Sequence, residues 1–193
     1  MKRLVGLTGG MGAGKSTLVN VARLLDIKVF DCDALVHQIY DDEMFLLSLD
    51  EHFGPIGENP RKYMGDLIAK NPEILSTIEE LMEDFFQTGI RQALQTIPQG
   101  SFLLMDAPIL FETKMDRMCD FVIAIQCPRE VREERVMQRP GMTREKMTAL
   151  MDRQISEADR LLRSQYIIHN TGSVTEAELK MAGIIRHLKE FYI

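Results

Sequence analysis

The stretch GGMGAGKS at residues 9–16 fits the pattern G-x-x-x-x-G-K-[ST]. It follows the apolar run Leu4 to Leu7, which is typical of a buried strand, and it leads into a segment with helical apolar spacing from Lys15 to Leu25. Glycines let the backbone turn its N–H groups inward around a phosphate, Lys15 adds a cation, and a helix start favours anions. The order of strand, loop and helix therefore predicts a nucleoside triphosphate site, which we favour over a glycine-rich turn with an unrelated lysine.

Charge and composition exclude several classes of partner. The 23 Lys and Arg against 29 Asp and Glu give a net charge of -6, so we expect no nucleic-acid partner, because such a partner needs a basic surface. No apolar run is long enough to cross a bilayer, and the first ten residues lack the apolar core of a signal peptide. Three cysteines without metal-ligand spacing complete the expectation of a reduced, cytoplasmic protein without a membrane partner.

Apolar periodicity predicts an alternation of strands and helices. Strands are expected at 4–7, 27–30, 101–105, 121–127 and 166–169. Helices are expected at 15–25, 34–49, 72–97 with a break near Gly89, 128–138 and 143–163, and after the capping box of Ser173 and Glu176. Asn71 is expected to cap the helix at Pro72, and 53–60 is expected to be a loop. The pattern predicts an α/β fold whose parallel sheet binds ligands beyond the carboxyl ends of its strands.

Two aspartates follow the second predicted strand. Asp31 and Asp33 flank Cys32, and residues two apart in an extended segment point the same way. One carboxylate is suited to accept the proton of an attacking hydroxyl, whereas the alternative role is to cap a helix starting at Ala34. We expect capping from one aspartate and substrate contact from the other.

A third aspartate ends the next apolar run. Asp106 follows FLLM at 102–105, where a phosphate-loop protein places the acidic residue that holds Mg²⁺ directly or through water. Ser16 offers a hydroxyl to the same ion. The alternative role for Asp106 is to form a turn at the end of the strand.

The residues alone assign no role to Glu112. The four histidines show no metal spacing and are interpreted as structural or surface residues: His37, His52, His169 and His187.

Arginines recur at helical spacing between residues 129 and 139. Such arginines can close over a phosphoryl group in transfer and exclude water, whereas the alternative is a solvated face paired with Glu133 and Glu134. Beside a phosphate loop we favour the first role for Arg135 and Arg139. The roles of Arg129 and Arg132 stay open.

No N-K-x-D motif for guanine is present, which disfavours a GTPase switch. Instead, the chain resembles the dephospho-CoA kinase family over nearly its whole length. The resemblance rests on TGGMGAGKST at 8–17, DCD at 31–33, FG at 53–54, DAPILFE at 106–112, and Arg135, Arg139, Gln154 and Asn170. The phosphate loop is shared by many families, whereas the combination of DCD, DAPILFE and the C-terminal N-x-G is specific.

This resemblance implies a fold and a reaction. The fold is a P-loop NTPase three-layer α/β fold with a five-stranded parallel sheet, a helical substrate-binding subdomain and a lid. Within one kinase domain at 1–193, we expect a core at 1–33, 100–128 and 164–193, a CoA-precursor subdomain at 34–99 and a lid at 129–163. The reaction is transfer of a phosphoryl group from ATP, with Mg²⁺, to the ribose 3′-hydroxyl of dephospho-CoA, the last step of CoA biosynthesis. A monomer or weak homo-oligomer is expected.

The resemblance also implies site residues. Asp33 would be the base or orienter of the hydroxyl, Lys15 would hold the β- and γ-phosphates, and Arg139 would come from the lid as a third catalytic residue. ATP contacts are expected at Gly9, Gly10, Met11, Gly12, Ala13, Gly14, Lys15, Ser16, Thr17, Arg135, Arg139 and Asn170. Substrate contacts are expected at Thr8, Asp31, Asp33, Arg61, Pro108 and Leu110, and metal contacts at Ser16 and Asp106.

The chain departs from the family pattern mostly on the acceptor and lid sides. It lacks the customary His-Pro pair around 79–82, and 57–61 is a short loop. Arg132, Leu150, Ser164 and Gln165 stand where the family has Gln, Arg, Ala and Asp. Two alternatives stay open: a kinase for another small acceptor, such as a nucleoside monophosphate or shikimate, and a non-catalytic ATP-binding sensor derived from a kinase.

Overall fold

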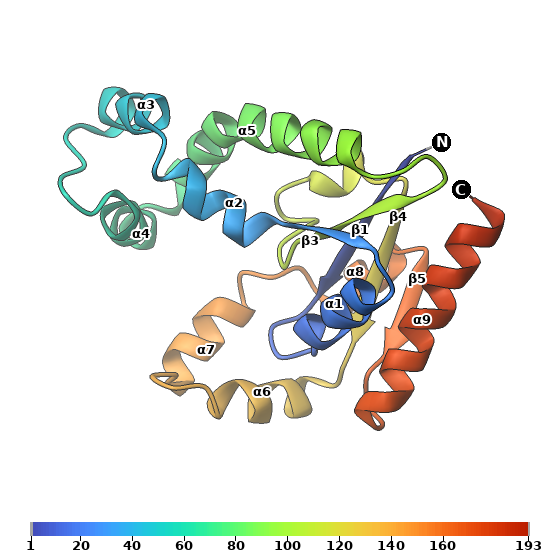
Figure 1. Cartoon of the computed structure of the whole chain (residues 1–193). Coiled ribbons are helices and arrows are strands. Elements are labelled where there is room, and N and C mark those ends of the chain that lie inside the picture. The colour runs from blue at the N-terminus through green and yellow to red at the C-terminus, as the bar shows by residue number, and fades with distance from the viewer. Residues whose placement is uncertain (1, 193) are drawn as a thin grey trace. The chain divides into compact units, whose positions relative to one another are not determined.

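A computed structural model describes residues 2–192 (Figure 1). Its strands are β1 (Arg3–Gly9), β2 (Lys28–Asp31), β3 (Phe102–Asp106), β4 (Phe121–Gln126) and β5 (Tyr166–His169). Its helices are α1 (Lys15–Leu24), α2 (Cys32–Ile39), α3 (Glu43–Phe53), α4 (Pro60–Lys70), α5 (Leu75–Thr96), α6 (Arg129–Met137), α7 (Arg144–Met151), α8 (Glu157–Leu162) and α9 (Val174–Phe191), with short 3₁₀ turns η1 (Pro72–Ile74) and η2 (Met115–Met118).

The chain divides into two compact units. Residues 1–30 and 94–193 form the first, and residues 31–93 form the second. The range 34–99 expected for a helical subdomain overlaps the second unit, but its last six residues fall in the first. That this unit receives the acceptor, and that 129–163 acts as a lid, stay predictions.

The sheet has the strand order β2-β3-β1-β4-β5. Parallel ladders join β1 to both β3 and β4, and β4 to β5. The predicted five-stranded parallel sheet is confirmed. Because β1 lies between β3 and β4, the segment after its carboxyl end leaves the sheet beside the segments that follow those two strands (Figure 1). Leu7 lies opposite Asp106, which places that aspartate near the exit of β1.

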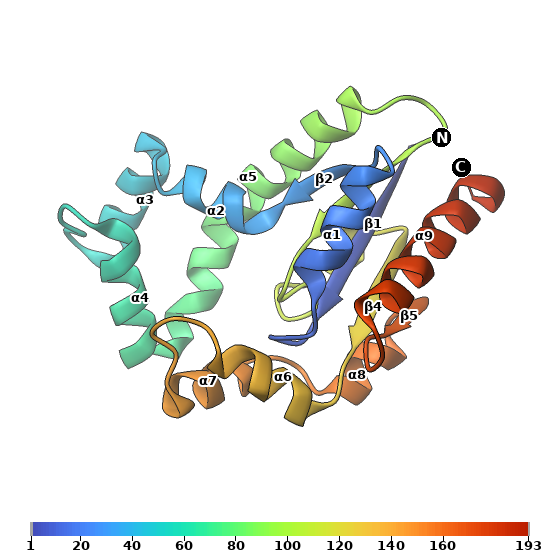
Figure 2. The same cartoon turned by 60° about the horizontal axis from the view of Figure 1, so that its bottom comes forward.

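One apolar core lies between the sheet and helices α1 and α9. Leu18 and Ala22 of α1 and Met181 and Ile185 of α9 pack with the side chains of the central strands. Figure 2 shows these two helices next to one another in front of β1 and β4, and their residues contact each other. Burying this apolar surface is the main driving force that holds the phosphate-loop helix against its strand.

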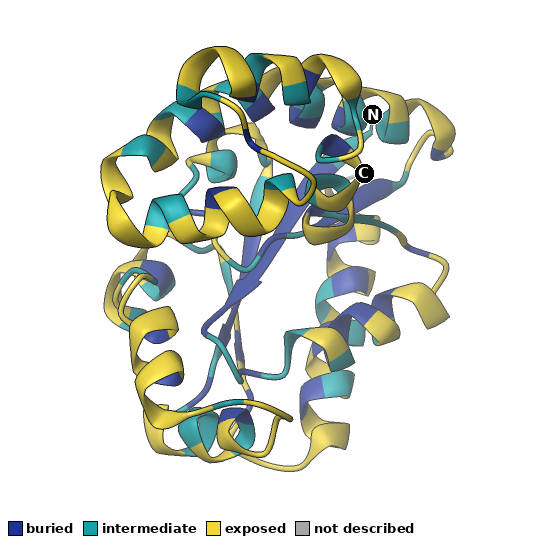
Figure 3. Cartoon of the chain, turned by 90° about the vertical axis from the view of Figure 1, so that its left-hand side faces the viewer, coloured by how far each residue is buried: buried dark blue, intermediate teal, exposed yellow. Residues whose placement is uncertain are grey.

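The second unit has its own packed aromatic centre. Phe45 is 1% exposed, and its ring meets those of Tyr40 and Phe85 edge-on at centroid distances of 5.3 and 5.9 Å. In the same unit Arg61 contacts the imidazole of His37. Figure 3 shows the strands of the sheet as buried and the outer sides of the helices as exposed.

Several predicted helices are wrong in their extent. The helix expected at 34–49 is two helices, because Asp42 caps α3 by accepting the Phe45 N–H at 3.0 Å. Residues 60–70 form α4, which Asn59 caps. Asn71 makes no side-chain cap, and α5 continues through Gly89 without a break because its buried residues keep helical spacing on both sides of that glycine.

The long helix expected at 143–163 is also wrong. Helix α7 ends at Met151 and α8 begins at Glu157, with Ser156 capping α8 by accepting the Asp159 N–H at 3.0 Å. The intervening residues 152–156 use their polar groups in contacts with other loops. By contrast, the strand at 166–169 and the Ser173 cap of the last helix are confirmed.

Among the described residues, none of the helices combines the length and apolar character required to cross a membrane.

The break between α2 and α3 gives a first prediction. Asp42→Ala removes the cap of α3 and should lower the free energy of unfolding by about 1 kcal/mol, as measured by urea denaturation. The neighbouring Asp41 is exposed and caps no helix, so Asp41→Ala is the matched control. An equal loss of unfolding free energy in the two variants would contradict the role of Asp42 as the cap of α3.

Candidate active site

The phosphate loop joins the central strand to α1 through the five residues 10–14. β1 ends at Gly9, and α1 begins at Lys15. Inside the loop, the Ala13 N–H donates to the Gly10 carbonyl at 2.9 Å, and the Thr17 N–H donates to the Gly14 carbonyl at 3.2 Å. Gly14 precedes α1 with φ of 92°, and no side chain caps the helix. A helix start without a side-chain cap offers backbone amides to an anion, and phosphate contacts by these residues stay predictions.

Two loop glycines are required by conformation and by crowding. Gly12 has φ of 82°, and a Cβ there would lie 2.6 Å from the Arg132 carbonyl oxygen. Gly14 is also left-handed, and its Cβ would collide with the side-chain amide of Asn170. Any larger residue would strain the backbone and displace α6 or Asn170.

Lys15 and Asp106 form an ion pair at the carboxyl ends of β1 and β3. Their side chains are 18% and 13% exposed, so solvent screens the pair only in part. Lys15 is thus held beside the loop by the aspartate that the sequence predicts as a metal residue. The flexible stem of a lysine allows its ammonium to move from the carboxylate to a phosphate.

The donor set here fits Mg²⁺ that arrives with a triphosphate. Ser16 is exposed in the first turn of α1, and its hydroxyl and the Asp106 carboxylate are the oxygen ligands that Mg²⁺ prefers. Within residues 2–192 no group of three His, Cys, Asp or Glu side chains is arranged to hold a metal. One carboxylate and one hydroxyl are sufficient where phosphate oxygens and waters complete the octahedron.

A pocket of about 190 Å³ lies on the α9 side of the loop and is lined by Gly14, Thr17, Leu18, Arg135, Asn170, Val174 and Ala177. Asn170 is 7% exposed and donates from Nδ2 to the Ala13 carbonyl at 2.7 Å. Arg135 donates from Nη1 to the Gly12 carbonyl at 3.4 Å. Both predicted ATP residues therefore contact the backbone of the phosphate loop.

The four arginines after β4 have different surroundings. Arg132 donates from Nε to the Cys127 carbonyl at 3.0 Å, and its guanidinium lies against the backbone of Gly10. Arg129 pairs with Glu133 at 2.7 Å, which raises the pKa of this exposed arginine. Arg139 follows α6 and is exposed. Arg132 thus supports the loop, whereas Arg129 belongs to a surface ion pair.

Two predicted substrate residues are buried inside the protein: Thr8 in β1 and Leu110 in the loop after β3. Thr8 is fully buried, and its hydroxyl donates to the Pro108 carbonyl at 3.4 Å. Leu110 is also fully buried, whereas Ile109, directly before it in the loop after β3, is 45% exposed. Direct substrate contacts by Thr8, Pro108 and Leu110 stay predictions. Ile109 is the apolar side chain that this loop presents, and sequence reasoning missed it because periodicity fails in a turn.

In the second unit the two aspartates of DCD have separate surroundings. Asp31 caps α2 by accepting the Ala34 N–H at 2.9 Å, so the prediction that one aspartate caps a helix is confirmed. Asp33 is exposed in the first turn of α2. Arg61 lies near Tyr40. Burial raises the pKa of Tyr40, and the positive charge of Arg61 lowers it in part. Substrate contacts by Asp31, Asp33 and Arg61 stay predictions.

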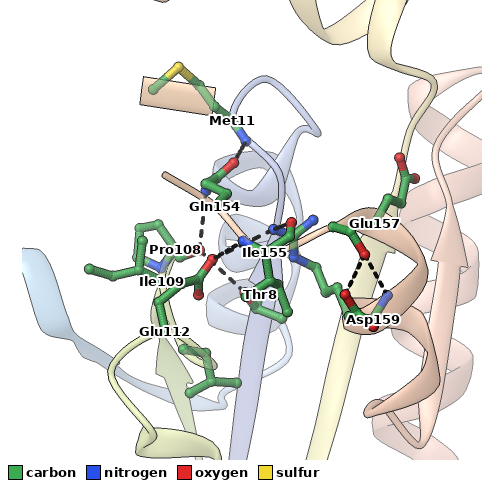
Figure 4. Close-up of polar contacts among 12 residues, drawn as sticks. Thr8, Met11, Pro108, Ile109, Glu112, Gln154, Ile155, Glu157 and Asp159 are labelled. Carbon is green, nitrogen blue, oxygen red and sulfur yellow. Dashed lines mark hydrogen bonds and ion pairs between the residues drawn. The ribbon is translucent and has the colours of Figure 1, made fainter. Parts of the chain in front are cut away.

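Glu112 and Gln154 connect three loops, as Figure 4 shows. Gln154 accepts the Met11 N–H on Oε1 at 2.8 Å and donates from Nε2 to the Pro108 carbonyl at 3.4 Å. Glu112 accepts the Ile155 N–H on Oε1 at 2.8 Å. The sequence assigned no role to Glu112, because only the break between α7 and α8 brings the 152–156 turn to it.

The surroundings of three residues that depart from the family pattern can be described: Gln165 and Ser164 form hydrogen bonds, and Leu150 is exposed. Gln165 accepts the Val122 N–H on Oε1 at 2.8 Å, at the edge of β4. Ser164 donates to the Arg160 carbonyl at 2.8 Å, after the end of α8. Leu150 is 39% exposed. The first two substitutions thus make hydrogen bonds inside the first unit.

A sequence model of the dephospho-CoA kinase family matches residues 3–176. The dephospho-CoA kinase of Agrobacterium fabrum (strain C58) is 32% identical over 193 residues, with 97% of this chain and 99% of the relative covered. That of Rhizobium meliloti (strain 1021) is 30% identical over 191 residues, with coverage of 96% and 98%.

Solved structures agree with the fold. TT1252 from Thermus thermophilus has a TM-score of 0.83 at 26% identity, with 97% of this chain and 98% of that chain covered. A dephospho-CoA kinase from Campylobacter jejuni has a TM-score of 0.73 at 24% identity, with 100% of both chains covered. A shikimate kinase from Acinetobacter baumannii has a TM-score of 0.54 at 17% identity, with 100% of this chain and 97% of that chain covered. The last two show the fold alone. The family match, together with the phosphate loop and its Lys15–Asp106 pair, means that this chain belongs to the dephospho-CoA kinase family.

Proposed function

We propose that this chain transfers the terminal phosphoryl group of ATP to the ribose 3′-hydroxyl of dephospho-CoA and releases CoA and ADP. The observation that carries the proposal is the pairing of Lys15 with Asp106 beside an uncapped helix start. This arrangement offers a mobile cation, a carboxylate and free amides at one point, which are the groups that phosphoryl transfer requires. The family match supplies the acceptor.

The nucleotide end of the reaction is assigned to the first unit. Amides of the phosphate loop between Gly9 and Thr17 hold the β- and γ-phosphates, and Lys15 exchanges its contact with Asp106 for the phosphate oxygens. Ser16 and Asp106 would hold Mg²⁺, which would supply positive charge to the phosphates. Arg135 and Asn170 contact the loop backbone at the pocket of about 190 Å³, which supports a place for the nucleoside there.

The acceptor end is assigned to the DCD segment and Arg61. Asp33 accepts the proton of the attacking hydroxyl, or orients it, since Asp31 is engaged as the cap of α2. Arg61 offers a guanidinium to the phosphates of the acceptor, where bidentate hydrogen bonds are strong. Arg139, exposed after α6, supplies positive charge to the moving phosphoryl group.

We also propose a cytoplasmic location for the reaction. Cys119 and Cys127 are free thiols, which agrees with a reducing compartment. Burial raises the pKa of Cys119 to about 12, with Asp116 and Asp120 adding to the shift, so this thiol resists ionisation and is poorly reactive.

A panel of acceptors tests the reaction. ADP release with ATP and Mg²⁺ should be rapid with dephospho-CoA and near background with AMP, CMP or shikimate. Turnover with another acceptor but none with dephospho-CoA would overturn the assignment. ATP binding without turnover on any acceptor would instead indicate a sensor.

Lys15→Ala tests the cation. Loss of a positive group at developing charge in a partly dry site should reduce kcat/KM by roughly a hundredfold to a thousandfold, measured as ADP release with dephospho-CoA. Lys189 is exposed in α9, so Lys189→Ala, with the same loss of charge, should retain wild-type activity. If both variants reduced kcat/KM by a similarly small factor, Lys15 would have no part in the mechanism.

Asp33→Asn tests the base. The variant keeps the shape of the side chain and leaves the Asp31 cap intact, so helix α2 should be unaffected. The rate should fall by roughly two to four decades if Asp33 takes the proton, with a smaller change in KM for dephospho-CoA. Asp66→Asn in α4 makes the same change of charge at an exposed site. A rate for Asp33→Asn within threefold of this control would argue against a base.

A further inference from the structure

We propose that Gln154 is a positioning residue for phosphoryl transfer, which fixes the Met11 end of the phosphate loop against the loop that follows β3. This inference deepens the proposed function, because the first loop binds the donor and the second is expected to contact the acceptor. Gln154 itself contacts no reacting atom. It acts through the backbone of Met11 and of Pro108.

The side-chain amide of Gln154 accepts one hydrogen bond through its oxygen and donates another through its nitrogen. The Met11 N–H can only donate, and proline has a carbonyl but no N–H, so its backbone can only accept. The orientation of the Gln154 amide is therefore determined by its partners: Oε1 towards Met11 at 2.8 Å and Nε2 towards Pro108 at 3.4 Å (Figure 4). No carboxylate, lysine or apolar side chain can make both hydrogen bonds.

The turn that carries Gln154 is fixed by hydrogen bonds to the backbone of the next residue, Ile155. The Ile155 N–H donates to Glu112 at 2.8 Å, and the Ile155 carbonyl accepts from Arg160 at 3.4 Å. Arg160 is 3% exposed and lies 3.9 Å from Glu112. Burial lowers the pKa of this arginine, and Glu112 opposes that shift. Gln154 is thus presented from a turn with little freedom to move.

Met11 is fixed from two sides. Its side chain packs on a cluster formed by Val136, Met147 and Met151, which belong to α6 and α7. Its N–H is held by Gln154. The next residue, Gly12, has φ of 82° and lies against α6. Met11, at one of the four x positions of the pattern G-x-x-x-x-G, is therefore one of the points where the phosphate loop is attached to the 129–163 segment.

Loosening this attachment should affect the rate more than binding. The phosphate-facing amides near Gly14 keep their own turn and should still bind ATP, whereas the Met11 end and Pro108 would drift relative to each other. A misplacement of about 1 Å far from the chemistry can cost roughly a hundredfold in rate.

Two variants and one control test the inference. Gln154→Leu removes both hydrogen bonds. Gln154→Glu keeps an acceptor for Met11 but places an oxygen without a proton against the Pro108 carbonyl. Gln99 is exposed in the turn before β3, and Gln99→Glu is the matched control for the change of charge. Steady-state kinetics with ATP and dephospho-CoA, thermal unfolding, and hydrogen exchange of the peptide containing Met11 are measured for each.

We expect kcat to fall roughly tenfold to a hundredfold in both Gln154 variants, with KM for each substrate within threefold and Tm within 2 °C of wild type. Exchange at Met11 should accelerate in Gln154→Leu and remain slow in Gln154→Glu. The inference is overturned if kcat stays within twofold of the control, if the loss follows a fall in Tm, or if exchange at Met11 is unchanged in Gln154→Leu. Absence of dephospho-CoA turnover in the wild-type chain would overturn the proposed function instead, and Met11 exchange would still test the attachment.

Discussion

The structure depends on the unpaired amides at the start of α1. Apart from the Thr17 N–H, which donates to the Gly14 carbonyl, the first N–H groups of a helix have no acceptor within it. No side chain caps this helix, so these groups require an anion or water in front of them. The chain places this start directly after the central strand of a parallel sheet. The apolar packing of α1 and α9 on that sheet holds the helix there, and only glycines fit the short connection at Gly12 and Gly14.

Around this helix start, the polar side chains support the loop. Asn170 and Arg135 donate to loop carbonyls, Arg132 lies against Gly10, and Lys15 is paired with Asp106. The loop backbone is therefore held by side chains from α6 and from the turn after β5, and Lys15 is held by the end of β3. This is the physical basis of preorganisation: charge and dipoles are in place before the reaction and need little rearrangement.

Sequence reasoning was most successful where local signals are strong. The glycine pattern, the buried strands and the Ser173 cap each depend on a few adjacent residues, and the structure agrees with them. It failed where helices end in the middle of an apolar pattern. The caps at Asp42 and Ser156 interrupt segments whose spacing continues, so periodicity alone joined α2 to α3 and α7 to α8.

The sequence by itself determined the nucleotide-binding class, the parallel α/β fold and the family, because a phosphate loop needs particular residues in consecutive order. Tertiary structure alone decided that Asp106 lies beside Lys15 and that Gln154 joins Met11 to Pro108. The Asp106 and Gln154 contacts link residues 46 to 143 positions apart in the chain. No local pattern encodes such pairs, since they form only when the strands align and the helix breaks at 152–156 bring the loops together.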